Sequence, residues 1–151
     1  MTMRVVRTSV VWLFLLFTVA GIAPGCNRST SDRDLRFVDA AEAQRTIAGS
    51  GGVLGIGGHR AGVWVDPRPA AAYAAGHIPG SINIPLADVR DRYRELDDYP
   101  SVIVYGEEPN SVIASSMSKT LQQLGIKEVS ILRGGLRAWR SANLPVDVGV
   151  N

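Results

Sequence analysis

From residue 35 onward, short apolar runs alternate with segments of helical composition. The runs predict five strands, at 36–38, 63–66, 82–84, 101–105 and 129–132. The segments between and after them predict helices at 40–48, 70–75, 86–96, 110–124 and 136–142. Regular alternation of strand and helix is typical of parallel sheets, and the nearly uninterrupted apolar run 101–105 indicates a strand covered on both faces. We therefore predict an α/β domain, doubly wound, with a central, mainly parallel sheet of about five strands flanked by helices.

Composition limits the chemistry that this domain can use. The chain has 151 residues, with one cysteine and two histidines, His59 and His77. One cysteine excludes an internal disulfide and a cysteine-rich zinc site, and two histidines cannot form a histidine-rich metal site. The length fits one domain, at residues 35–147, with a short tail at 148–151. We predict no cofactor and no metal.

The N-terminus has the pattern of an export signal, which we place at residues 1–25. Arg4 and Arg7 precede an uncharged, mostly apolar run at 10–23. This run is shorter than the ~20 residues that a membrane-spanning helix needs, and Pro24 and Gly25 end it. A retained anchor helix is the alternative.

The only cysteine, Cys26, follows that run directly. The segment Ala23-Pro24-Gly25-Cys26 resembles a bacterial lipobox, in which the cysteine is lipidated and becomes the mature N-terminus, although Pro24 departs from the pattern. The polar residues 26–34 then form a tether. We expect an exported lipoprotein of the cell envelope, anchored to a membrane and with its domain outside the cytoplasm. The alternative is an incidental cysteine in a leader that is cut nearby.

Charge gives no reason to expect a nucleic-acid partner. The net charge of +2 comes from the leader, which contains two of the basic residues and no acidic one. In the predicted helix 86–96, Arg90, Arg92 and Arg94 alternate with acidic residues, as on an exposed salt-bridged face. The glycine-rich stretch 49–62 lacks the Lys-Ser/Thr that would follow a phosphate-binding loop, so we interpret it as a linker.

Two blocks of residues resemble the rhodanese-like domain family. The first runs from 63 to 85 and includes Asp66-Pro67-Arg68 and Gly76-His77-Ile78-Pro79-Gly80-Ser81; the second ends with Gly134-Gly135, Trp139 and Leu144-Pro145. The resemblance covers roughly 35–146 and implies a doubly wound fold and sulfur transfer from a donor such as thiosulfate. In that family, a cysteine directly after the central strand carries the sulfur, inside a loop of backbone N–H groups.

In this sequence the corresponding position is Gly106, which has no nucleophile. We call residues 106–111 the pocket loop: Gly106, Glu107, Glu108, Pro109, Asn110 and Ser111. Pro109 removes an N–H, Ser111 replaces a frequent arginine, and the two glutamates are expected to be solvated and to repel an anionic donor. Cys26 cannot substitute, because it is either removed or acylated. We predict no catalytic residue and a binding or scaffold module with an unknown protein or small-molecule ligand.

Two enzymatic alternatives stay open. A thiosulfate-type sulfurtransferase would need an external thiol to complete the site. A different enzyme would use Glu107 or Glu108 as an acid, a base or a cation ligand.

Three further residues are predicted to lie near this site in structural roles. Asp66 and Arg68 are expected to form an ion pair, although the acidic residue usual before Tyr73 in the family is Ala72 here. The alternative for Arg68 is a place at the mouth of the site. His77 is expected to fix a turn by hydrogen bonding, with a general base as the alternative.

Overall fold

The computed structural model describes residues 31–49 and 61–149. The predicted leader, Cys26 and most of the glycine-rich stretch 49–62 lie outside the described residues.

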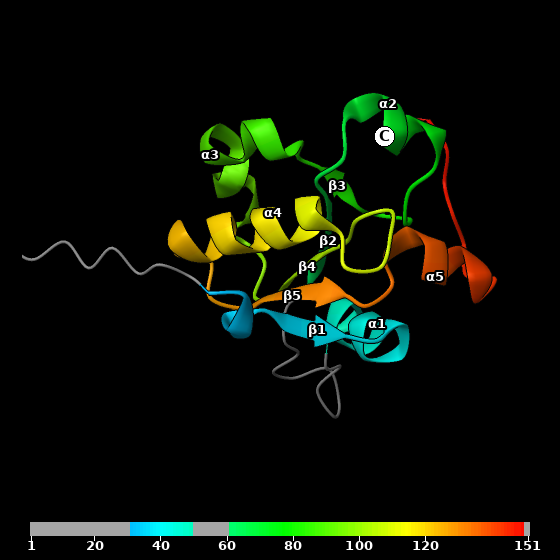
Figure 1. The fold of residues 1–151 in the computed structure, drawn as a ribbon, viewed down its shortest axis with the longest axis horizontal. Coiled ribbons are helices and arrows are strands. Elements are labelled where there is room, and N and C mark those ends of the chain that lie inside the picture. The colour runs from blue at the N-terminus through cyan, green and yellow to red at the C-terminus, as the bar shows by residue number, and fades with distance from the viewer. Residues whose placement is uncertain (1–30, 50–60, 150–151) are drawn as a thin grey trace, which may run out of the picture.

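Five parallel strands form one sheet in the order β1-β5-β4-β2-β3. The strands are β1 (Arg36–Val38), β2 (Val63–Asp66), β3 (Ile82–Asn83), β4 (Val102–Val104) and β5 (Val129–Leu132). The predicted fold class is therefore confirmed, with every pairing in this sheet parallel. Figure 1 shows the strands side by side between two layers of helices.

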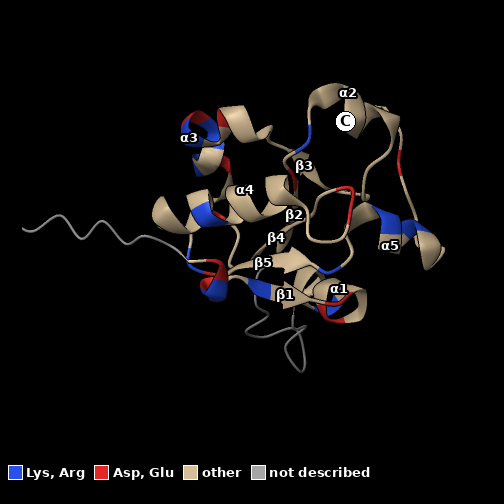
Figure 2. Ribbon diagram, in the orientation of Figure 1, with Lys and Arg blue, Asp and Glu red and all other residues tan. Residues whose placement is uncertain are grey.

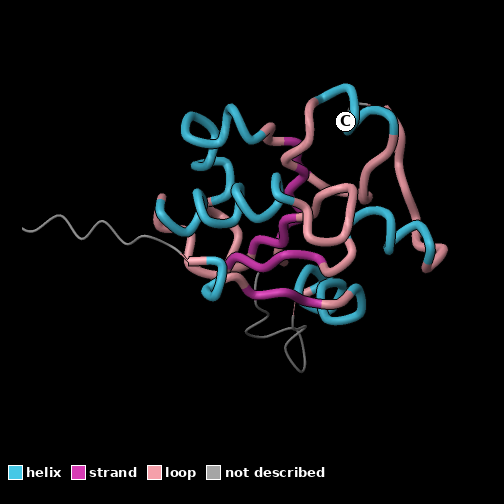
Figure 3. Tube along the Cα trace, in the orientation of Figure 1, coloured by secondary structure: helices cyan, strands magenta, loops and turns pink. Residues whose placement is uncertain are grey.

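The helices fall close to the predicted segments (Figure 3). The α-helices are α1 (Ala40–Ala48), α2 (Ala70–Ala75), α3 (Val89–Arg92), α4 (Val112–Gln123) and α5 (Gly135–Ser141). Short 3-10 turns are η1 (Asp32–Asp34), η3 (Leu86–Asp88) and η4 (Tyr93–Leu96). The single helix expected over 86–96 is thus η3, α3 and η4 in succession.

The first residues of α1 and α4 are held by side-chain N-caps. Asp39 caps α1 by accepting a hydrogen bond from the Glu42 N–H at 2.8 Å. The Glu42 carboxylate pairs with Arg36 at 2.7 Å instead of reaching back to the backbone of Asp39, so the reciprocal contact of a capping box does not form. Ser111 caps α4 through its hydroxyl, which accepts from the Ala114 N–H at 3.4 Å.

Side chains alternate between the two faces of the sheet and build two cores. On β4, Val102 and Val104 face the layer of α3 and α4, whereas Ile103 and the following Tyr105 face the layer of α1 and α5. The first core contains Met117 and Leu121 from α4, and the second contains Leu136 and Trp139 from α5. Burial on both faces explains the continuous apolar run of this strand.

The chain leaves β4 and β5 toward opposite faces. The helix after β4 is α4 and the helix after β5 is α5, which cover different layers (Figure 1). Connections that diverge in this way open a crevice at the carboxyl ends of the two strands, where ligands of doubly wound sheets bind. Within residues 31–49 and 61–149, no helix has both the length and the apolar character needed to cross a membrane.

Tyr105 connects the end of β4 to the turn after α2. Its ring is fully buried and meets Trp64 edge to face, with centroids 6.3 Å apart. Its hydroxyl accepts from the Ile78 N–H at 3.1 Å and lies 2.9 Å from the Ser81 hydroxyl. Burial raises the pKa of Tyr105, and the nearby charge of Asp66 raises it further.

We predict that Tyr105→Phe destabilises the domain by about 1–3 kcal/mol near neutral pH, because the buried Ile78 N–H loses its acceptor. Above pH ~10 the unfolded tyrosine releases a proton that the folded one keeps, so this residue lowers wild-type stability by up to ~1.4 kcal/mol per pH unit. The gap between wild type and variant therefore shrinks as the pH rises. Urea unfolding at neutral and alkaline pH measures it.

Tyr99→Phe is the control, since Tyr99 is 36% exposed. It should change stability by no more than about 0.5 kcal/mol. A gap between Tyr105→Phe and wild type that stays constant with pH contradicts the prediction.

Candidate functional site

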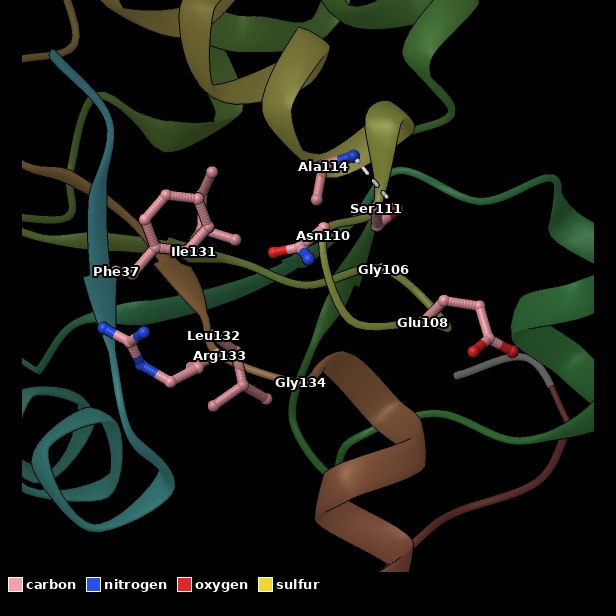
Figure 4. A pocket seen from close by; sticks show the side chains of 10 residues that line it. All are labelled: Phe37, Gly106, Glu108, Asn110, Ser111, Ala114, Ile131, Leu132, Arg133 and Gly134. Carbon is pink, nitrogen blue, oxygen red and sulfur yellow. Dashed lines mark hydrogen bonds between the residues drawn. The ribbon is translucent and has the colours of Figure 1, made fainter. Parts of the chain in front are cut away.

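The pocket loop lies at the carboxyl ends of β4 and β5. It borders an open cavity of about 130 Å³. Figure 4 shows the side chains around it. The lining residues are Phe37, Gly106, Glu108, Asn110, Ser111, Ala114, Ile131, Leu132, Arg133 and Gly134. The structure therefore brings the predicted loop into one site with residues from β1, β5 and α4.

Gly106 and Ser111, at the two ends of the loop, are in close contact. A Cβ added to Gly106 would overlap both Oγ and Cβ of Ser111, well inside any observed contact distance. Gly106 itself is buried. The space that a side chain at position 106 needs is therefore already filled by the side chain that caps α4.

The carbonyl groups of the loop point toward the start of α5. Gly106 and Glu107 accept hydrogen bonds from the N–H groups of Leu136 and Arg137 at 2.8 and 3.0 Å. Gly135 lies against them with φ = +61°, and a Cβ there would come within 2.5 Å of the Gly106 oxygen. A residue without a side chain is required here both by the left-handed backbone and by the close approach.

The two loop glutamates are paired with arginines rather than simply solvated. Glu107 contacts Arg68 at 2.5 Å and Arg140 at 2.6 Å, and Glu108 pairs with Arg137. Figure 2 shows the acidic loop beside the basic side of α5. The expectation of a solvated, anion-repelling loop therefore needs correction, because α5 and Arg68 offset its charge.

Asp66 and Arg68 form the buried ion pair beneath the loop. The Arg68 guanidinium bonds to Asp66 at 2.6–3.1 Å and donates to the Gly76 carbonyl at 2.7 Å. Burial alone lowers the pKa of Arg68, but the hydrogen bonds and charge of Asp66 outweigh it and the pKa is raised overall. Arg68 thus stays protonated and holds Glu107 from below.

His77 lies apart from the cavity, at the turn after α2. Its ring is fully buried, stacks on Tyr73 with centroids 3.8 Å apart, and places Nδ1 3.0 Å from the Tyr73 carbonyl. Its backbone forms an antiparallel bridge with Asp147. These contacts support the structural interpretation of His77, which is not among the residues that line the cavity.

Two polar side chains on the cavity wall are unpaired in the described part of the chain. Arg133 is exposed and stacks over Phe37, 5.9 Å from the ring centroid. Asn110 adopts φ = +55° and projects toward Phe37 and Ile131, whereas the Glu108 carboxylate points away (Figure 4). No group of three potential metal ligands occurs within the described ranges.

A family model decides the identity of the domain. The model for the rhodanese-like domain matches residues 54–142, which is more than half of the chain. The chain belongs to the rhodanese-like domain family. Its five-stranded parallel sheet agrees with that assignment.

Several known proteins resemble this rhodanese-like domain. The HTH-type transcriptional regulator Rv0324 of Mycobacterium tuberculosis is 42% identical over 56% of this chain, and YqhL of Bacillus subtilis is 33% identical over 54%. The chain covers only 37% and 64% of these relatives' own lengths. The crystal structure of BH2092 from Bacillus halodurans has a TM-score of 0.60 and 30% identity, over 75% of this chain and 77% of that one.

Sequence reasoning identified Arg68 but missed three other arginines at the site of this rhodanese-like domain, Arg133, Arg137 and Arg140. Arg137 and Arg140 lie one helical turn apart, so their side chains leave the same face of α5, and the glycines before them place that face against the loop. The spacing of these two arginines can be read from the sequence, but the direction in which this face of α5 points cannot. Arg133, at the end of β5, carried no signal beyond its position.

We predict that Gly135→Ala costs about 3 kcal/mol of stability, because it adds left-handed strain and a clash with the loop carbonyls. Gly80→Ala is the matched control: Gly80 has φ = +73°, but nothing lies within 4 Å of its added Cβ. It should cost only about 1 kcal/mol. Urea unfolding of both variants tests this, and equal losses would show that the loop can move away from α5.

Proposed function

We propose that this chain is an exported, lipid-anchored rhodanese-like domain that has no sulfurtransferase activity and serves as a binding or scaffold module. Its cavity beside the pocket loop would hold the ligand. The observation that carries the proposal is the filled space at Gly106, where the family resemblance puts the sulfur-carrying cysteine. Position 106 lacks a thiol and has no room for one.

The contacts of the loop support this proposal further. The Gly106 and Glu107 carbonyls are engaged by α5, Pro109 has no N–H, and both glutamates are held by arginines. The engagement of both carboxylates in ion pairs supports a structural role for the loop.

Glu107 also provides a reason for the altered loop. The family's usual acidic residue before Tyr73 is Ala72 here, and Glu107 supplies a carboxylate to Arg68 at 2.5 Å. The loop thereby takes over a structural contact. A loop that anchors a buried guanidinium is suited to hold a fixed pocket shape.

Export and anchoring rest on the leader and Cys26. An apolar run of signal-peptide length ends at the chain's only cysteine, with small residues in front of it. We propose that the mature chain begins at Cys26 and that several acyl chains fix it to a membrane, since one chain binds only marginally.

The absence of sulfur transfer is tested with purified Cys26→Ser protein. We expect no turnover of thiosulfate and cyanide above the uncatalysed rate, because the variant contains no thiol. Turnover by this variant above the uncatalysed rate overturns the noncatalytic proposal.

Because Ser111 fills the space beside position 106, Ser111→Gly should change the stability in opposite directions in wild type and in Gly106→Cys. Gly106→Cys should lose about 2–3 kcal/mol of stability, through overlap with Ser111. Ser111→Gly should cost a few tenths of a kcal/mol (about 0.3) in wild type, where glycine is a weaker cap, yet stabilise the Gly106→Cys background by about 1 kcal/mol or more. Chemical unfolding of the four proteins measures this cycle. Additive effects would contradict the overlap.

The lipid anchor predicts incorporation of labelled palmitate into wild-type protein expressed in a bacterium that processes lipoproteins. The label should vanish in Cys26→Ala and persist in Ser29→Ala, a matched change in the polar tether. Absence of label from wild type would overturn lipidation, and membrane retention of an unlabelled chain would point to a retained leader.

A further inference from the structure

We propose that the cavity beside Gly106 binds a small carboxylate that carries an apolar group, with the carboxylate on Arg133 and the Asn110 amide. This inference rests on the proposed binding function and names its ligand class. The ligand's apolar group would lie against Phe37 and Ile131. Figure 4 shows these four side chains around one opening.

The charge balance around the loop favours a single negative charge. Four arginines lie around the loop: Arg68, Arg133, Arg137 and Arg140. The carboxylates of Asp66, Glu107 and Glu108 pair with three of them. Arg133 alone among the four has no carboxylate partner within the described residues. An anion bound at Arg133 would therefore give each of the four arginines a negatively charged partner. A planar guanidinium binds a carboxylate with two parallel hydrogen bonds, which makes a carboxylate the fitting anion.

Packing holds the guanidinium at the wall of the cavity. Arg133 follows β5 directly, and its N–H donates to the Val38 carbonyl at 2.8 Å. Its side chain stacks on Phe37 of the neighbouring strand β1. A cation held on an aromatic ring loses less conformational entropy on binding than a freely rotating one.

Asn110 supplies the second polar contact from the opposite side. Its side chain has no hydrogen-bond partner within the described residues, and its left-handed backbone (φ = +55°) turns it toward Phe37 and Ile131. An amide N–H₂ can donate to a carboxylate oxygen. Arg133 and Asn110 thus approach the cavity from two different elements.

The remaining wall limits the size and charge of the ligand. Phe37, Ile131 and Ala114 give it an apolar side, and a cavity of about 130 Å³ admits only a small molecule. A dianion such as inorganic phosphate would place its second charge against this apolar side without a counter-ion. A short branched monocarboxylate satisfies both parts of the wall.

The test is an NMR titration of the full-length Cys26→Ser chain, using isovalerate as the probe. We expect saturable shifts in the amide signals of the pocket loop, apart from Pro109, and of residues 131–134. Isovaleramide, the neutral analogue of the same shape, should bind at least about tenfold more weakly, because it lacks the charge that Arg133 recognises.

Three variants locate the contact. Arg133→Gln should weaken isovalerate about tenfold, and Asn110→Gly, which keeps the left-handed backbone, should weaken it about threefold. Arg94→Gln is the matched control, since Arg94 is likewise exposed and stacks on a ring, Tyr93, at 5.4 Å. It should leave binding unchanged.

The results also separate the possible sources of the ligand. Tighter binding of acetyl-glycyl-valine than of isovalerate would assign the carboxylate to a peptide terminus, and the reverse order to a free acid; both support the inference. No saturable shift, equal binding of isovaleramide, equal binding by Arg133→Gln, or tighter binding of phosphate overturns it. The thiosulfate assay reports separately on the proposed function, so the two failures are distinguishable.

Discussion

The buried guanidinium of Arg68 joins the segments on which the site depends. It bonds to Asp66 at the end of β2, to the carbonyl of Gly76 after α2, and to Glu107 in the loop after β4. Its side chain is only 8% exposed, so its desolvation is offset only while these partners stay in place. Removing Arg68 would leave acceptors unpaired in three parts of the chain at once, whereas removing one partner would leave only part of the guanidinium unpaired.

The loop after β4 is held from a second direction by α5. Gly134 and Gly135 bring the first turn of that helix close enough to donate to the Gly106 and Glu107 carbonyls. Arg137 and Arg140 then reach the carboxylates of the same loop. Because these two carbonyls and both carboxylates are bonded within the protein, contacts inside the chain hold the loop in place, as in the largely preformed sites that small ligands use.

The strands of the sheet could be predicted from the sequence, but the ion pairs around the pocket loop could not. Apolar runs indicate the strands directly, since a short, continuously apolar run such as 102–104, set among helical segments, is typical of a strand buried on both faces of a parallel sheet. The pairing of Glu107 with Arg140, by contrast, joins residues 33 positions apart and depends on how α5 is rotated. Likewise, the overlap of Ser111 with a side chain at 106 follows from the tightness of the loop, which composition does not encode.

These two layers of contact explain why a single substitution would not turn the site into a sulfur-transfer cradle. A cysteine at 106 first needs the space of Ser111, and that serine caps α4. A loop that binds an anionic donor would need Pro109 replaced to restore an N–H and Glu107 replaced to remove its charge, yet removing Glu107 leaves Arg68 without its loop partner. An acidic side chain at Ala72 would then have to replace it, as in the family pattern. The altered loop is therefore coupled to the stability of the fold, and among the described residues the cavity wall keeps a guanidinium and an amide unpaired beside an apolar side.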